Sequence, residues 1–315
     1  MSNSTVNRYA SNEKIAMCAI YNVLFVLIIF SCATVIVTIV TQPILRKAFN
    51  YYVLSLCFSD ILASSVIVPI NTLILLEKLS KTHLCLISQL SFLLEVALFN
   101  SIYSVVAIAM DRHRAIVRPL NLRQGRPFLC VFFIWCSGLL YVLPRFVVVR
   151  KMSSCKLDDR EELVFNVMDL IVAYIVPVMI VTDLYRRAIK VLKESQDTTP
   201  NMIAHRRKRR AIRMIVVISS IFAVCWLPYH LLGLFNRDIF SNTAAVRKFR
   251  RVLRYVSTTL ILLSGWINVI IYGYFNECFR KTFHLLLRKV FNCSLRSKKN
   301  VTAAFVSQQN TSSNE

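Results

Sequence analysis

Seven long apolar stretches, separated by short polar segments, recur along the chain. Each has about 20 residues or more, the length that a helix needs to cross the ~30 Å of hydrocarbon in a bilayer. The alternating pattern of membrane β-barrel strands is absent, so the stretches are expected to be helices. The predicted spans cover residues 17–40, 51–76, 84–110, 128–149, 163–185, 212–235 and 252–274. The pattern predicts an all-α membrane protein built as a seven-transmembrane helix bundle.

The rest of the chain is organised around this bundle. We expect residues 1–16 to form an outer N-terminus, 17–274 the membrane domain, 275–291 a short interfacial eighth helix and 292–315 an inner tail. In the eighth helix, apolar and basic side chains occupy opposite faces, as they do in helices that lie on a membrane. The apolar face has Phe279, Phe283, Leu286 and Leu287, and the basic face has Arg280, Lys281 and Arg288.

Composition and charge agree with this pattern. The 315 residues are 56% hydrophobic, with only five glycines and a mean hydropathy of +0.55, which excludes an ordinary soluble domain. If the N-terminus lies outside, 24 of the 39 Lys and Arg residues fall on the inner side and 15 on the outer side. Inner loops of membrane proteins carry the excess of basic residues, so this orientation is predicted.

A dense basic run covers residues 205–213. Such a run is also typical of nuclear targeting or nucleic-acid binding. Here it directly precedes an apolar span, so we interpret it as charge that faces anionic membrane lipid, and we expect no nucleic-acid partner.

The N-terminal segment carries one candidate modification site. Asn3-Ser4-Thr5 is a glycosylation sequon on the predicted outer side. Residues 1–16 are too polar for a signal peptide, so the first span is expected to serve as the targeting signal.

An Asp-Arg-His triplet, Asp111 to His113, closes the third span. Charged groups at membrane depth are costly, and they are tolerated where they pair, face the bundle interior or carry a function. The triplet is therefore a candidate functional element.

Several further motifs lie in order, each on or beside its own span. They are Asn50 to Asp60 in span two, Asp111 to Leu120 after span three, Trp135, Pro177 with Tyr185, Phe222 to Tyr229, Asn268 to Tyr272, and Asn276 to Phe283. Together they resemble the rhodopsin-like (class A) family of G-protein-coupled receptors over nearly the whole chain. The resemblance implies a plasma-membrane receptor, not an enzyme, that activates a heterotrimeric G protein.

The resemblance also implies a polar site in the middle of the bundle. Asp60 matches a position that helps to hold a sodium ion in the family, and Ser101 and Asn268 match other members of that site, whereas Ser264 stands where the family often has Asn. A hard cation prefers such oxygen ligands. The alternative is a hydrogen-bonded packing node without an ion.

Span six carries the expected moving part. Pro228 removes a backbone hydrogen bond and bends the helix. In the family this bend lets the inner end swing outward to admit the G protein, and Phe222 and Trp226 match its toggle residues. For Trp226 the alternative is a bulky core residue.

The inner ends of the spans supply the implied G-protein switch. Its matched residues are Asp111, Arg112, His113, Tyr185, Asn268 and Tyr272. Tyr185 and Tyr272 match tyrosines that stabilise the open state in the family.

The chain departs from the family pattern at three places. Ser31-Cys32 replaces the usual Gly-Asn of span one, and Val269 replaces the proline of the last motif, so span seven is expected to bend less. Lys208 stands where many members place an acid. The ionic lock between Arg112 and span six is therefore expected to be missing, which predicts ligand-independent signalling.

The ligand is less defined by the sequence than the fold. The candidate pocket residues are Glu95, Asp169, Trp226, Tyr229 and His230. The Cys-Trp-Leu-Pro-Tyr-His segment at 225–230 resembles peptide receptors most. A basic rim is expected outside, with Arg145, Arg150 and Lys151 beside one loop and Arg247, Lys248, Arg250, Arg251 and Arg254 in another, and it would steer acidic peptides or be a solvated face.

Other ligand classes are also compatible with parts of the sequence. A small cationic amine between Glu95 and Asp169 is the alternative, although either acid could equally be structural. Leu94 fills the position of the amine-binding Asp, and Leu262 that of the retinal-binding lysine. A transporter is a more distant alternative, because no internal repeat is visible.

The resemblance further implies a disulfide between Cys85 and Cys155 on the outer side. Cys293, just after the predicted eighth helix, suits palmitoylation. Serines and threonines of the tail are candidate phosphosites for a receptor kinase and arrestin, namely Thr302, Ser307, Thr311, Ser312 and Ser313.

Overall fold

A computed structural model describes the backbone of residues 3–76, 81–117, 126–152, 157–198, 202–235, 243–276, 278–283 and 285. Within these ranges, the side chains of residues 3–11, 81–85, 194–198, 202–205, 207–208, 211 and 235 are not described. Several predicted sites fall outside the described side chains: the disulfide of Cys85 and Cys155, the sequon at Asn3, Cys293, Lys208 and the phosphosites of the tail.

Seven helical spans long and apolar enough to cross a membrane lie in the described part of the chain, so the predicted helix bundle is confirmed. The elements are α1 (Asn3–Thr41), η1 (Pro43–Leu45), α2 (Ala48–Leu75), α3 (Lys81–Val117), α4 (Pro127–Lys151), α5 (Asp159–Leu170), η2 (Ile171–Ile175), α6 (Val176–Thr198), α7 (Met202–Phe235) and α8 (Ala244–Phe275). Span five consists of α5, η2 and α6 together. Residues 278–283 are also helical, which is the described part of the predicted eighth helix.

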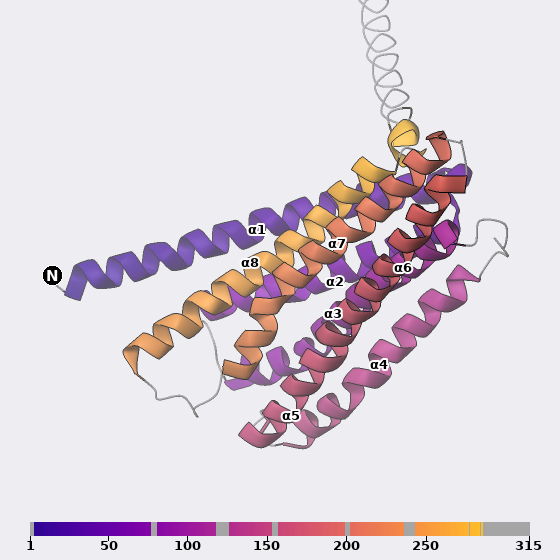
Figure 1. The fold of residues 1–315 in the computed structure, drawn as a ribbon. Coiled ribbons are helices and arrows are strands. Elements are labelled where there is room, and N and C mark those ends of the chain that lie inside the picture. The colour runs from indigo at the N-terminus through magenta and orange to yellow at the C-terminus, as the bar shows by residue number, and fades with distance from the viewer. Residues whose placement is uncertain are drawn as a thin grey trace, which may run out of the picture.

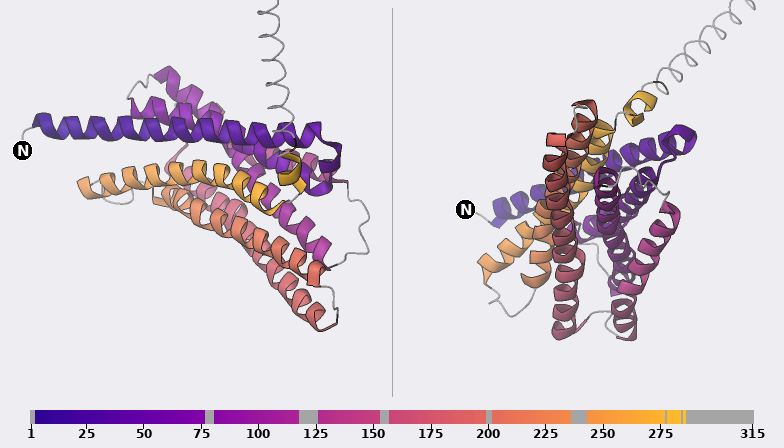
Figure 2. Two further views of the ribbon diagram at one scale, coloured as in Figure 1. Left: turned by 90° about the horizontal axis from the view of Figure 1, so that it is seen from above. Right: turned by 45° about the vertical axis from the view of Figure 1, so that its right-hand side comes forward.

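The helices lie side by side as an elongated bundle (Figure 1). α3 is central, since it contacts α2, α4, α6 and α7, whereas α1 packs against α2 and α8. α4 lies along one edge of the bundle in Figure 1 and on the outside in the right-hand view of Figure 2, and it packs against α3 and α2. Large apolar side chains point outward, among them Phe30, Phe128 and Leu140, each about 70% exposed, as expected of surfaces that face lipid.

A polar node joins α2, α3 and α4 inside the bundle. Trp135 Nε1 donates a hydrogen bond to Ser55 Oγ at 3.1 Å, and the Ser55 and Ser104 hydroxyls lie 2.9 Å apart. Beside it, Gly138 allows α4 to approach closely, because a Cβ there would lie 2.9 Å from Asn100 Oδ1. Small residues and interhelical hydrogen bonds of this kind stabilise helix packing in membranes. Trp135 therefore anchors α4.

Helix ends differ from the predicted spans where capping residues extend them. α5 begins at Asp159, before residue 163, because Asp158 and Glu161 form a capping box in which the Glu161 carboxylate accepts from the Asp158 backbone N–H at 3.3 Å. α8 begins at Ala244, before residue 252, and its N-cap Thr243 accepts from the Val246 N–H at 3.4 Å.

The longer α8 corrects one prediction. Arg247, Lys248, Arg250, Arg251 and Arg254 were expected to crowd a loop, but they lie on the first turns of α8. The apolar span began at Val252 only because these turns are too basic to count as membrane-spanning. They form a basic helical end, not a loop.

Candidate functional site

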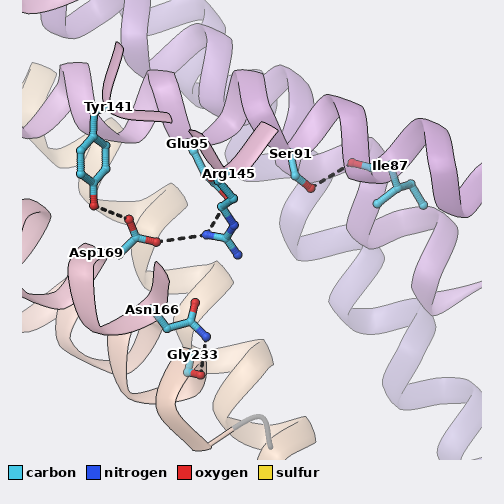
Figure 3. A network of polar contacts seen from close by, with 8 residues as sticks. All are labelled: Ile87, Ser91, Glu95, Tyr141, Arg145, Asn166, Asp169 and Gly233. Carbon is cyan, nitrogen blue, oxygen red and sulfur yellow. Dashed lines mark hydrogen bonds and ion pairs between the residues drawn. The ribbon is translucent and has the colours of Figure 1, made fainter. Parts of the chain in front are cut away.

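A buried ionic cluster ties α3, α4 and α5 together at one end of the bundle (Figure 3). The Nη1 atom of Arg145 lies 3.0 Å from Glu95 Oε1 and 3.1 Å from Asp169 Oδ2. Tyr141 donates its hydroxyl hydrogen to Asp169 Oδ1 at 2.7 Å. The three charged side chains are only 17–22% exposed. We call Glu95, Tyr141, Arg145 and Asp169 the ionic cluster.

The cluster brings together two residues that were predicted to share a pocket, Glu95 and Asp169, but it also corrects the place of Arg145. This arginine was expected on the basic rim beside a loop. It lies inside α4 and points between the two carboxylates, because a buried charge needs opposite charges close by. Tyr141 lies one turn before Arg145 on the same face of α4. This spacing of four residues was the only sequence pattern that could have indicated that both side chains point to the same site.

An aromatic group fills the centre of the bundle around the toggle residues. Trp226 is 4% exposed, and its ring centroid lies 5.3 Å from Phe222, 6.3 Å from Tyr229 and 6.4 Å from His230. His230 is also buried, and Tyr174 packs on it at 5.2 Å. Trp226 is thus surrounded by candidate pocket residues, which is compatible with both of its predicted roles.

The π-helix η2 was not predicted and links α3 to α7. Tyr103 of α3 donates to the Val172 carbonyl at 3.0 Å, and Tyr174 of η2 donates to the Ala223 carbonyl of α7 at 2.8 Å. Ala223 directly precedes Val224, whose carbonyl lacks the usual N–H donor because residue 228 is a proline. A π-turn inside a helix frequently marks a functional site. No sequence pattern revealed these two tyrosines, because their partners lie on other helices.

The polar core of the bundle contains Asp60. Ser101 donates to Asp60 Oδ1 at 3.0 Å, as the resemblance implied, while the buried Oδ2 atom has no hydrogen-bond partner. Asp60 and Asn268 line the same small cavity of about 10 Å³, which has room for about one water-sized sphere. Ser264 donates its hydroxyl hydrogen to the Ile261 carbonyl of its own helix at 2.7 Å.

These residues fit a small hard cation. An anionic oxygen without a partner, a neighbouring amide and a hydroxyl in a cavity of this size are the ligands and the room that sodium needs. Because the Ser264 hydroxyl acts as a donor in its hydrogen bond to Ile261, the lone pairs of its oxygen can still accept a hydrogen bond or bind a cation.

At the other end of the bundle, Arg112 is held by its neighbours. Its NH2 group lies 2.6 Å from Asp111 Oδ2, and its guanidinium carbon lies 4.1 Å from the centre of the Phe49 ring. Tyr272 stacks on Phe49 at 5.9 Å and donates to Asn50 Oδ1 at 3.2 Å. Arg112 therefore has an acid and an aromatic face as partners.

Arg112 also lines an open crevice of about 260 Å³ between the ends of α2, α3, α7 and α8. Across it, Arg210 of α7 donates to the Tyr274 carbonyl of α8 at 2.6 Å. We call this hollow the Arg112 crevice.

The other switch residues take different places. Tyr185 packs with Ile116, Ala188 and Ile212 between α3, α6 and α7, so it lies in a separate apolar cluster. His113 is partly exposed, and its Nε2 atom has no hydrogen-bond partner. α8 continues as a helix through Val269 to Phe275, and the smaller bend expected at Val269 stays a prediction.

Comparisons with known proteins place the chain in a family. The profile of the family described as "7 transmembrane receptor (rhodopsin family)" matches residues 31–272. The chain belongs to this family of receptors, so it is a multi-pass membrane receptor and not an enzyme. The resemblance stated from the motifs is confirmed.

Among similar proteins are several receptors named for peptides. The chain is 25% identical to the QRFP-like peptide receptor of Branchiostoma floridae, over 91% of this chain and 81% of that protein. It is 26% identical to the Substance-P receptor of Mus musculus, over 89% and 74% respectively. It is 26% identical to the Tachykinin-like peptides receptor 86C of Drosophila melanogaster, covering 77% of this chain and 53% of that protein.

Proposed function

We propose that this chain is a plasma-membrane receptor that binds an extracellular peptide and activates a heterotrimeric G protein. The observation that carries the proposal is the Arg112 crevice, which has the switch arginine on one wall and the base of α7 on another. An outward movement of α7 would widen the crevice and admit the G protein. The orientation with the N-terminus outside and the crevice inside follows from the distribution of basic residues.

The position of Pro228 supports the proposed movement of α7, because a proline inside a helix removes a backbone hydrogen bond and makes the helix easier to bend there. The proline lies two residues after Trp226, whose ring contacts the candidate pocket residues Tyr229 and His230. A ligand that rearranges these rings in one state and not in the other shifts the equilibrium between the two positions of α7.

The relatives and the ionic cluster bear on the ligand class. Names such as QRFP-like peptide receptor support a peptide for this chain as well. Both pocket acids, Glu95 and Asp169, already share Arg145, so a small amine would have to compete with a guanidinium. The amine alternative keeps one observation in its favour, since two carboxylates face one guanidinium and a negative charge is left over.

A panel assay tests the ligand class. Cells that produce the full chain are treated with synthetic acidic and basic peptides and with amines, and G-protein activation is read from a biosensor. We expect a peptide to activate, and we expect Arg250→Gln with Arg251→Gln to raise the half-maximal concentration of an acidic peptide about tenfold through lost steering. Arg46→Gln is the control, because Arg46 lies at the other end of the bundle and its loss should leave the half-maximal concentration of the peptide unchanged.

Two outcomes of these assays would contradict the peptide proposal. If only amines activate the receptor and Glu95→Gln abolishes their effect, the ligand is an amine and the peptide proposal is wrong. Uptake of a labelled compound into vesicles that contain the protein would instead support a transporter.

We also propose that Asp60, with Ser101, Asn268 and Ser264, holds an allosteric sodium ion. The unpartnered Asp60 Oδ2 atom supports this proposal. The ion would supply the positive charge that the buried carboxylate lacks. The test is whether sodium raises the melting temperature of the purified protein.

A further inference from the structure

A cavity of about 150 Å³ lies between α3, α6 and α7 and shares no described lining residue with the Arg112 crevice. Its inner wall consists of Ile102, Val105 and Val106 of α3, which are all buried. Phe222 of α7 adds an aromatic wall. The described lining residues carry no charge and include none of the candidate ligand-pocket residues. The cavity is therefore a separate site, and its walls suit a neutral apolar group.

The mouth of the cavity lies between α6 and α7. Thr182 of α6 and Ser220 of α7 line the cavity and are exposed. Thr182 is one helical turn from Met179, and Ser220 is one turn from Val224. Met179 and Val224 are each more than half exposed, and large apolar side chains on the outside of a membrane bundle face lipid. The cavity therefore opens toward the lipid.

The two hydroxyl groups at the mouth have no hydrogen-bond partner. Serine and threonine in helices can donate to the carbonyl of the preceding turn, as Thr34 and Ser219 do at 2.7 Å. Within the described part of the chain, Thr182 and Ser220 form no such bond. A hydroxyl that faces hydrocarbon without a partner is costly. Both hydroxyls can therefore bind a polar group that arrives from the lipid.

We propose that this cavity binds a small lipid-soluble phenol, that is, one aromatic ring with a hydroxyl group. An apolar cavity of about 150 Å³ accepts one benzene-sized ring. The ring packs between Val105 and Phe222, where an aromatic contact adds to the burial of apolar surface. The phenol hydroxyl exchanges hydrogen bonds with Thr182 and Ser220. A lipid acyl chain in the same place would leave both hydroxyls without a partner.

The binding experiment uses the full chain in nanodiscs of neutral lipid, with para-fluorophenol and para-fluorotoluene as probes. The two molecules have the same fluorinated ring, but only the first has a hydroxyl group. Binding is measured by fluorine NMR as saturable line broadening beyond that in empty nanodiscs, which corrects for partition into lipid. The measurement needs no peptide and no G protein, so its result is independent of the proposed receptor function.

Val178→Phe tests the position of the site, and Val176→Phe is its matched control. Both valines lie on α6 and are half-buried, but only Val178 lines the cavity. The new ring at residue 178 should fill the cavity. We expect saturable binding of para-fluorophenol to be lost in Val178→Phe and kept in Val176→Phe.

The double variant Thr182→Val with Ser220→Ala tests the two hydroxyls. The wild-type protein should bind para-fluorophenol about fivefold more tightly than para-fluorotoluene, the usual net effect of one hydrogen bond. The double variant should bind the phenol about fivefold more weakly than the wild-type protein does. Its affinity for the toluene should be unchanged, because the apolar walls remain.

Several results would overturn the proposal. These are no saturable binding of para-fluorophenol, equal affinities of the wild-type protein for the two probes, and binding by Val178→Phe equal to that by Val176→Phe. The melting temperature of each variant in nanodiscs shows whether it is folded. If Val178→Phe does not fold, the double variant decides: a loss confined to the phenol supports the site, and an unchanged affinity for the phenol contradicts it.

Discussion

At the scale of single residues, buried charge determines which side chains meet. Glu95 and Asp169 were predictable as functional or paired residues, because acids are costly in apolar spans, and the structure brings both to Arg145. The sequence did not reveal Arg145 as their partner, because it lies near the end of its span, where arginines commonly reach to the membrane surface. Only the rotation of α4 relative to α3 and α5 decides that its side chain points inward.

Asp60 leads to a prediction at the same scale. The purified protein should melt at a higher temperature in sodium chloride than in choline chloride of equal ionic strength, since an ion that binds only the folded state stabilises it. At a sodium concentration ten times the dissociation constant, the gain is about 1.4 kcal/mol. Asp60→Asn should remove the sodium dependence, because the amide cannot replace the carboxylate charge.

Ser59→Ala is the control for Asp60→Asn. Ser59 is the preceding residue on α2, is fully buried and donates to the Ser55 carbonyl at 2.9 Å, so its loss should not alter the sodium effect. If Asp60→Asn keeps the full sodium dependence, Asp60 is a packing node and the ion proposal fails.

At the scale of elements, the spans were predictable because hydrophobic length is a local property of the sequence. The helix ends were less predictable. α5 and α8 begin in polar segments, where the N-cap residue and not hydrophobicity determines the first helical residue. The π-helix η2 was not predictable, since its hydrogen bonds to Tyr103 and Ala223 depend on how α3 and α7 pack against it.

The bond from η2 to α7 leads to a second prediction. Tyr174→Phe removes the hydrogen bond to the Ala223 carbonyl but keeps the ring that packs on His230. A hydrogen bond of this kind contributes about 1 kcal/mol, a factor of about five in an equilibrium. The loss should free α7 and raise ligand-independent G-protein activation up to about fivefold, measured by nucleotide exchange at equal receptor amounts.

Tyr103→Phe is the matched control, because it removes the other bond to η2 without touching α7. It should raise basal activation less than Tyr174→Phe does. Unchanged or lower basal activation in Tyr174→Phe would mean that this bond does not restrain α7.

At the scale of the whole molecule, the two ends of the bundle have different chemistry. The ionic cluster lies toward one end and the Arg112 crevice with its basic lining lies at the other, while the aromatic group around Trp226 fills the centre of the bundle. α7 passes from one end to the other and contains Pro228 two residues after Trp226. The motif order predicted this arrangement. Two further contacts of α7 became visible only in the packed bundle: the Tyr174 hydroxyl donates to the Ala223 carbonyl of α7, and Arg210 of α7 donates to the Tyr274 carbonyl.

The central claim is that this receptor catalyses nucleotide exchange on a G protein through Arg112, and one measurement tests it most directly. The full chain in nanodiscs is mixed with purified heterotrimers of each main class, and binding of a non-hydrolysable GTP analogue is followed over time. We predict exchange above the receptor-free rate with at least one class of G protein, its loss in Arg112→Gln and its retention in Arg114→Gln. The side chain of Arg114, two residues after Arg112, is exposed and does not line the crevice. Exchange that is equal in Arg112→Gln and the wild-type protein, or absent with every class for folded receptor at saturating agonist, would contradict the account.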